Sequence, residues 1–195
     1  SDNLSDFGYE TSDLGVSVGT SFQQFENLYF SPAIDISYEK LETTSAASAA
    51  KKKQEGDYFD TYLNYSLNYD LRNKTFRPDE GYRNSFIQEL PLVSESYEIV
   101  NSFESTRYQK ISNMVTKVSF YGKAVNTLNN KDVRISKRLY IPGSKLRGFE
   151  SGKIGPIEND DFIGGNYVSA VNFSTTLPQV LPSFQNMDFS FFVDA

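Results

Sequence analysis

Long stretches of this chain alternate apolar and polar residues one by one. The clearest stretch covers residues 59–72, where Leu63 and Leu67 fall on one side and Asn64 and Ser66 on the other. Successive side chains of a strand point to opposite faces, so this pattern predicts a strand with one apolar and one polar face. At about 14 residues it is more than twice as long as an ordinary globular strand of about 5–6 residues.

Seven further segments show the same alternation less regularly. They cover residues 14–22, 28–39, 82–92, 97–108, 114–125, 166–177 and 184–194. No segment has the period of an amphipathic helix, although residues 46–53 favour helix by propensity. We therefore expect an all-β fold, an antiparallel meander of about eight long strands. Pro32 cannot donate a hydrogen bond to a β-ladder, which predicts a bulge or a missing bond in the second strand.

The connections between these strands differ in length. Those at residues 43–57 and 126–165 are long, and the others are short. Counted alternately along a meander, both long connections fall on the same edge of the sheet. Transmembrane β-barrels have short turns on one side and long loops on the other. Their strands also need about 9–11 residues to cross the apolar zone, which these segments exceed. The pattern thus predicts part of a transmembrane β-barrel.

The composition agrees with a barrel better than with a soluble domain. Only 38% of the 195 residues are hydrophobic, yet 15% are aromatic. A soluble core would be poor in aliphatic side chains, whereas a barrel wall needs one apolar face per strand and aromatic girdles at the membrane interfaces. A run of about 18 apolar residues is absent, so no transmembrane helix is predicted.

Missing residue types exclude several functions. The chain has no His and no Cys, which excludes Ser-His-Asp and Cys-His catalysis, His-based metal sites and disulfides. The net charge is −6, and the only basic run, at residues 51–53, lies in low-complexity sequence, so nucleic-acid binding is not expected. The candidate carboxylate pairs are Glu39 with Glu42, Asp57 with Asp60 and Asp160 with Asp161, and we assign no catalytic role to any of them. We place Asp57, Asp60 and Asp160 at the surface. We predict no enzyme activity, no metal and no cofactor.

A glycine-punctuated loop supplies the most specific motif. Residues 146–156 read LRGFESGKIGP, and an acidic segment with Gly-Gly follows. Gly148, Gly152 and Gly155 can adopt backbone angles closed to other residues, so the loop can fold tightly. The Arg-Gly-aromatic tip at Arg147 resembles the lumen-inserted loop of the BamA family of outer-membrane barrels.

Two other segments share this resemblance. The hairpin at residues 62–86 is similar to a barrel hairpin of the family, and the final FFVDA is similar to its F-x-D-G element, with Ala195 in place of Gly. The similarity covers nearly all of residues 1–195, in the order of the sixth to thirteenth strands of a barrel of about sixteen. It implies a partial barrel domain without a complete second domain. Such a fragment would form an open curved sheet.

The resemblance also assigns roles to single residues. In the family, the loop Arg docks against acidic residues of the next two strands. Arg147 matches this Arg, and Asp194 matches the acidic position in the last strand. The other acidic position falls on Asn172, which can make only a neutral hydrogen bond. Gly148 would allow a close backbone approach, and Phe149 would pack on the lumen wall.

The function implied by the resemblance is the insertion of β-barrel proteins into the outer membrane of a Gram-negative bacterium, without ATP or cofactor. Implied partners are the lipid bilayer, unfolded outer-membrane protein clients, which can pair by β-augmentation at a seam, and assembly-machinery lipoproteins. One alternative is a TamA-like or two-partner-secretion barrel. Others are a passive porin, a ligand-binding surface barrel, and a soluble β-rich adhesin or carbohydrate-binding module.

Overall fold

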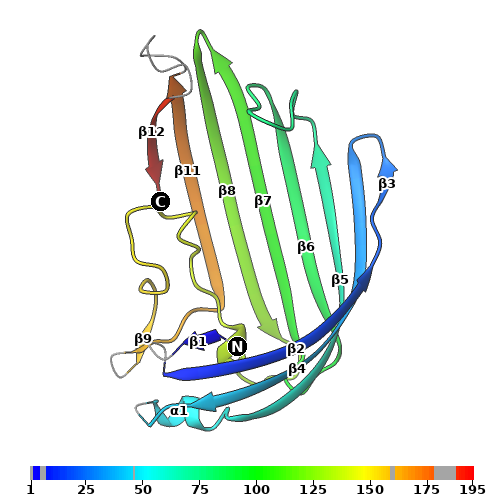
Figure 1. The fold of residues 1–195 in the computed structure, drawn as a ribbon, viewed down its shortest axis with the longest axis vertical. Coiled ribbons are helices and arrows are strands. Elements are labelled where there is room, and N and C mark those ends of the chain that lie inside the picture. Colours follow the sequence, from blue (N-terminus) through cyan, green and yellow to red (C-terminus); the bar gives the residue numbers. More distant parts are fainter. Residues whose placement is uncertain (1, 5–7, 46, 159–160, 178–187) are drawn as a thin grey trace.

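The computed structural model describes residues 2–4, 8–45, 47–158, 161–177 and 188–195. One antiparallel sheet holds nearly all of its regular structure (Figure 1). Its strands are β1 (Asp2–Leu4), β2 (Tyr9–Gly19), β3 (Phe22–Phe25), β4 (Leu28–Thr43), β5 (Gly56–Asp70), β6 (Gly81–Val93), β7 (Glu98–Ile111), β8 (Met114–Thr127), β11 (Tyr167–Leu177) and β12 (Phe189–Asp194).

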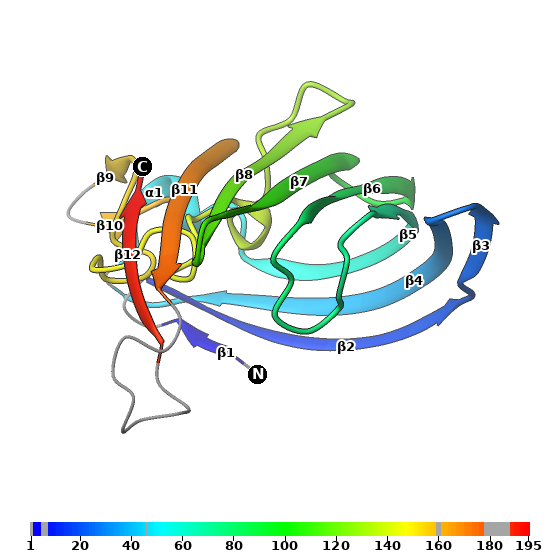
Figure 2. The same cartoon turned by 90° about the horizontal axis from the view of Figure 1, so that it is seen from above.

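The sheet is open and strongly curved (Figure 2). Its ladders run in the order β1-β2-β4-β5-β6-β7-β8-β11-β12, with β3 paired to β4. Within the described residues no ladder joins β12 to β1 or β2. The expected antiparallel meander and open curved sheet are therefore confirmed. The expected turn at residues 178–183 and the start of the last segment, residues 184–187, lie outside the described residues.

The missing N–H of Pro32 is accommodated by a break in the neighbouring strand, and β4 itself has no bulge at this position. The register of β4 with β5 runs without a shift from Leu28 to Leu41. The strand on the other side is interrupted, because β2 ends opposite Ala33 and β3 begins opposite Phe30. Thr20 still donates its backbone N–H to the Pro32 carbonyl over 3.0 Å. The N–H that Pro32 lacks thus falls in the gap between β2 and β3.

Short elements interrupt the longer connections. A single helical turn, α1 (Ala49–Lys52), is N-capped by Ser48, which accepts a hydrogen bond from the Lys51 backbone N–H over 3.3 Å. A 3-10 turn, η2 (Ile135–Lys137), and a hairpin of β9 (Ile157–Glu158) and β10 (Asp161–Phe162) lie in the longest connection. Each of these elements is too short to show a residue periodicity in the sequence. No helix in the described part of the chain is long and apolar enough to span a membrane.

The two longest connections and one short connection lie at one edge of the sheet, which we call the loop edge. Residues 44–55, 94–97 and 128–166 connect strands there, whereas residues 71–80 and 112–113 form turns at the opposite, turn edge (Figure 1). The one-sided pattern expected from the sequence is therefore present.

The turn of residues 71–80 leads into Gly81, whose φ is +94°. A Cβ atom at this position would lie 2.1 Å from the Leu71 carbonyl oxygen. Both the backbone angle and the available space therefore require glycine.

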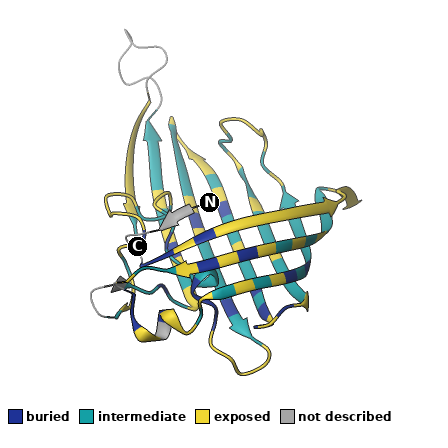
Figure 3. Ribbon diagram, turned by 60° about the horizontal axis from the view of Figure 1, so that its bottom comes forward, coloured by how far each residue is buried: buried dark blue, intermediate teal, exposed yellow. Residues whose placement is uncertain are grey.

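The two faces of the sheet have opposite character, and buried and exposed residues alternate along part of β4 (Figure 3). On the convex face, Ile34 and Ile36 of β4 are 47% and 45% exposed, and no second layer of described residues covers them. Aromatic rings also contact one another across neighbouring strands of this face, with centroids 5.6–6.2 Å apart in the pairs Phe22–Phe30, Phe30–Tyr65, Tyr65–Phe86 and Phe103–Phe120. The concave face carries polar residues, and its buried part lies under residues 128–166, the long loop.

Candidate functional site

The long loop is held on the concave face by three basic residues. Arg134, Lys145 and Arg147 each form an ion pair with carboxylates of the wall. These five carboxylates come from four strands that are far apart in the sequence, namely Glu39 of β4, Asp60 of β5, Glu98 and Glu104 of β7 and Asp194 of β12. The loop therefore crosses much of the inner wall.

The tip of the loop is fixed by Arg147 and Asp194, which we call the tip anchor. The Arg147 Nε and Nη2 atoms donate to Asp194 Oδ2 and Oδ1, both over 2.7 Å, and its backbone N–H donates to Oδ2 over 3.0 Å. The guanidinium also lies 3.6 Å from the ring centroid of Phe192 on the same strand. This bidentate geometry is the strong form of an Arg–carboxylate pair. The two residues that the resemblance pairs are thus in direct contact.

Asn172 supports this contact differently from the expected way. Its amide does not reach Arg147 but donates to Asp194 Oδ1 over 2.9 Å and to the backbone carbonyl of Lys145 over 2.6 Å. A carboxylate could not donate either bond. Asn172 therefore links the wall to the loop backbone as a hydrogen-bond donor.

Two expectations for the tip are wrong. Phe149 is 61% exposed and does not pack on the described wall. A Cβ at Gly148 would meet nothing within 4 Å, so no close backbone approach requires glycine there. The requirement comes from the backbone, since φ is +85° at Gly148, +79° at Gly152 and +130° at Gly155.

Lys145 adds a contact between the tip and the middle of the wall. Its Nζ atom donates to Glu104 Oε1 over 2.5 Å and lies 5.2 Å from the ring centroid of Tyr121. The Lys145 side chain is 19% exposed and that of Glu104 is 42% exposed. Solvent screens an ion pair of this exposure, so it contributes less than a buried one.

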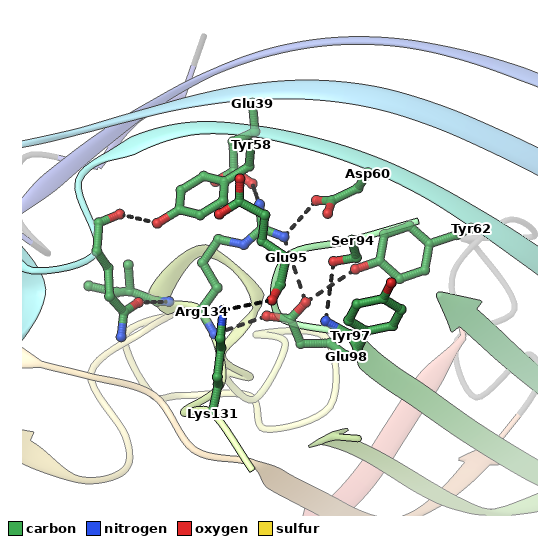
Figure 4. A network of polar contacts seen from close by, with 12 residues as sticks. Glu39, Tyr58, Asp60, Tyr62, Ser94, Glu95, Tyr97, Glu98, Lys131 and Arg134 are labelled. Carbon is green, nitrogen blue, oxygen red and sulfur yellow. Dashed lines mark hydrogen bonds and ion pairs between the residues drawn. The ribbon is translucent and has the colours of Figure 1, made fainter. Parts of the chain in front are cut away.

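The start of the loop is fixed by Arg134 with Glu39, Asp60 and Glu98, which we call the stem anchor (Figure 4). Arg134 Nη1 donates to Glu39 Oε2 over 3.0 Å, and Nη2 donates to Asp60 Oδ2 over 2.6 Å. Nη2 also lies 3.6 Å from Glu98 Oε2. All four side chains are at most 6% exposed. The guanidinium stacks on Tyr58, 4.1 Å from the ring centroid.

Backbone groups of the stem are bound as well. Glu98 Oε1 accepts the Arg134 backbone N–H over 3.1 Å, and its Oε2 accepts the Tyr62 hydroxyl over 3.2 Å. The Ile135 N–H donates to Gln54 Oε1 over 2.7 Å. Side chains from the wall and from residues 44–55 thus satisfy backbone donors of the loop, as burial requires.

Apolar residues close both sides of the stem anchor. Val133 packs with Val100 and Val125 on one side, and Ile135 packs with Tyr9 and Leu41 on the other. Val133, Arg134 and Ile135 are 3%, 2% and 3% exposed. The stem is therefore part of the hydrophobic core on the concave face.

Charge in the stem anchor is unbalanced, because three carboxylates surround one guanidinium. Glu39 Oε1, Asp60 Oδ1 and Arg134 Nε are buried without a hydrogen-bond partner among the described residues. Burial alone would lower the pKa of Arg134, but the hydrogen bond with Asp60 and the charges of Glu39 and Glu98 raise it above its ordinary value. The hydrogen bond with Asp194 raises the pKa of Arg147. Both arginines are therefore cations at any physiological pH.

The stem anchor was not predicted from the sequence. Asp60 was expected at the surface, whereas the structure buries it at 1% exposure beneath Arg134. The usable signal was the apolar-basic-apolar order of Val133, Arg134 and Ile135 within an otherwise polar connection. A charged residue between two apolar ones is buried with them when the segment packs on a wall.

Chemically, this arrangement positions a loop. No group of three or more Asp or Glu side chains in the described part of the chain could hold a metal ion. The carboxylates of the two anchors face guanidinium groups.

Comparison with known proteins extends over the whole chain. Residues 1–195 match a family model described as the Omp85 superfamily domain. A human protein named sorting and assembly machinery component 50 homolog is 27% identical over 143 residues, which cover 68% of this chain and 29% of that protein. The outer membrane protein assembly factor BamA of Neorickettsia risticii is 22% identical over 192 residues, 95% of this chain and 26% of that protein.

A solved structure shares the fold. The crystal structure of BamA from Haemophilus ducreyi lacking POTRA domains 1-3 superposes with a TM-score of 0.84 at 20% identity, over 95% of this chain and 41% of that one. The chain thus spans between a quarter and a third of these two curated relatives.

Proposed function

The chain belongs to the Omp85 superfamily, and from this premise we propose that it is part of the barrel of a BamA-type factor that inserts β-barrel proteins into an outer membrane. In this proposal residues 1–195 form one partial barrel domain, with the convex face in lipid. The clients are unfolded outer-membrane proteins, and assembly-machinery lipoproteins are further partners. The fragment contributes wall, loop and rim, and it is not an enzyme.

The observation that carries the proposal is the position of the long loop. It lies on the concave face with Arg147 paired to Asp194, while apolar side chains such as Ile34 and Ile36 stay exposed on the convex face. A soluble sandwich or adhesin would cover that apolar face with a second layer. An exposed apolar face of this extent is what a bilayer covers in a transmembrane barrel.

The membrane in question is proposed to be that of a Gram-negative bacterium. The relative from Neorickettsia risticii aligns with 95% of the chain, against 68% for the human relative. The longer alignment supports the bacterial assignment, whereas the identity is higher for the human relative, at 27% against 22%.

The proposal is tested with the full-length protein that contains this chain. It is reconstituted into vesicles of phosphatidylethanolamine and phosphatidylglycerol, and a urea-unfolded eight-stranded outer-membrane barrel is added. We expect the client to fold several-fold faster than with empty vesicles, measured by its heat-modifiable gel migration. Ion conductance without client folding would instead identify a passive porin. Export of a single cognate passenger would identify a secretion barrel.

A further inference from the structure

We propose that Arg134 is a positioning residue that holds the long loop on the concave face independently of Arg147. In this view the tip anchor can open while the stem anchor stays closed, so the tip can move without the loop leaving the barrel. The role of Arg134 as a positioning residue deepens the proposed function and rests on it, whereas the independence of the two anchors is a property of the fold.

The side chains of Arg134 and Arg147 differ in burial. The Arg134 side chain is 2% exposed and bridges β4, β5 and β7. The Arg147 side chain is 40% exposed and binds a carboxylate of one strand, β12. Solvent competes for an exposed guanidinium but not for a buried one, so the tip opens at a lower cost than the stem.

The second argument is that the two anchors share no residue. The stem anchor uses Glu39, Asp60 and Glu98, and its neighbours Val133 and Ile135 pack on two separate apolar clusters. The tip anchor uses Asp194, with Asn172 and Phe192 beside it. Interactions without a shared partner act independently, so the loss of one leaves the other intact.

The third argument is the charge balance of the stem. Three buried carboxylates meet one guanidinium there, and two of their oxygens have no partner among the described residues. If Arg134 left, these carboxylates would remain buried without the guanidinium that they now face. The tip differs because one carboxylate, Asp194, faces one guanidinium there, and both of its oxygens are hydrogen-bonded. The stem is therefore held closed by more unpaired buried charge than the tip.

The test uses hydrogen exchange of the full-length protein in lipid, read by mass spectrometry on peptides that cover residues 133–141 and 144–152. Arg147→Ala should raise exchange in the second peptide only. Arg134→Met should raise exchange in the first peptide on the order of 100-fold. Arg138→Met is the matched control, because Arg138 belongs to the same loop and forms no ion pair among the described residues, and it should change neither peptide.

A variant that fails to fold is replaced by one without unpaired buried carboxylates. It combines Arg134→Met with Glu39→Gln, Asp60→Asn and Glu98→Gln, and correct folding is checked by heat-modifiable migration. Exchange at residues 133–141 should still rise. Arg134→Lys, which keeps the charge but cannot bridge separate carboxylates with a planar fork, should give an intermediate value.

Conductance in planar bilayers completes the test. Arg147→Ala alone should leave conductance near the wild-type level, and the combination with Arg134→Met should raise it several-fold. Exposure of residues 133–141 in Arg147→Ala, or equal conductance in the single and double variants, would overturn the inference. If wild-type protein does not fold clients while the exchange pattern holds, the proposed function fails and the independence of the anchors stands.

Discussion

The concave and convex faces of the sheet are built from the same strands but follow opposite rules. On the concave face charged groups such as Arg134 and Asp60 are buried and paired. On the convex face apolar groups such as Leu67 and Ile34 have no protein layer over them among the described residues. Neighbouring residues in one strand can therefore differ completely in what a substitution costs.

This contrast shows which of the two faces determines the specificity of the fold. An apolar convex face accepts any side chain that is compatible with lipid, because lipid adapts to its shape. The concave face must match particular donors to particular acceptors, as the anchors do. The following substitutions test the contrast, beginning with the largest expected effect.

Arg134→Ala should have the largest effect. It leaves Glu39, Asp60 and Glu98 buried without their guanidinium partner, and breaking a buried pair in this way costs about 3–5 kcal/mol. The free energy of unfolding of the full-length barrel, obtained from urea titration, measures the loss. Arg138→Ala is the control and should change little. A loss below about 1 kcal/mol would mean that the stem anchor is not formed in the folded protein.

Leu67→Arg should have the next largest effect. Leu67 lies between Phe30 and Phe86 on the convex face, and a charge at mid-bilayer on that face costs about 2–4 kcal/mol. The adjacent substitution Ser66→Arg faces the concave side and should stay within about 0.5 kcal/mol. Equal urea midpoints for the two variants would contradict the assignment of the faces.

Asn172→Leu should cost about 1 kcal/mol, because it removes two hydrogen bonds while keeping the side-chain volume. The lost bonds are those to Asp194 and to the Lys145 carbonyl. Hydrogen exchange at residues 144–152 should rise in parallel. Unchanged exchange there would show that Asn172 does not link the loop to the wall.

Lys145→Ala should have the smallest effect, about 0.2–1 kcal/mol, because its pair with Glu104 is partly exposed. Salt screens such pairs, so the difference from wild type should vanish at about 1 M salt. A difference that persists at high salt would point to the contact with Tyr121 and not to the ion pair.

The fold could be read from the sequence because its signal repeats along every strand. Leu63, Leu67 and their alternation partners predicted the length and the facing of the strands. The one-sided distribution of long connections predicted part of a barrel, and the resemblance to a partial barrel predicted the open sheet. Pro32 predicted a bulge or a missing bond, but not that the gap would open between the neighbouring strands β2 and β3. That outcome depends on pairing between segments, which a single strand does not encode.

Only part of the candidate site could be predicted from the sequence. The resemblance led to Arg147 and Asp194, yet no local pattern reports the exposure of Phe149 or the contact of Arg147 with Phe192. Arg134 was missed because its partners Glu39, Asp60 and Glu98 lie 95, 74 and 36 residues earlier in the chain. Ion pairs between residues so far apart in the sequence produce no periodic pattern in it.

The stem anchor also sets how far the tip can travel. Arg147 lies 13 residues after Arg134 in the sequence. A fully extended chain spans at most about 3.3–3.6 Å per residue, so this tether could carry the tip on the order of 45 Å from its fixed end. When the tip anchor is open, the tip could therefore reach much of the concave face while Arg134 stays bound to the wall. Shortening the segment between the two anchors would restrict this range without changing either anchor.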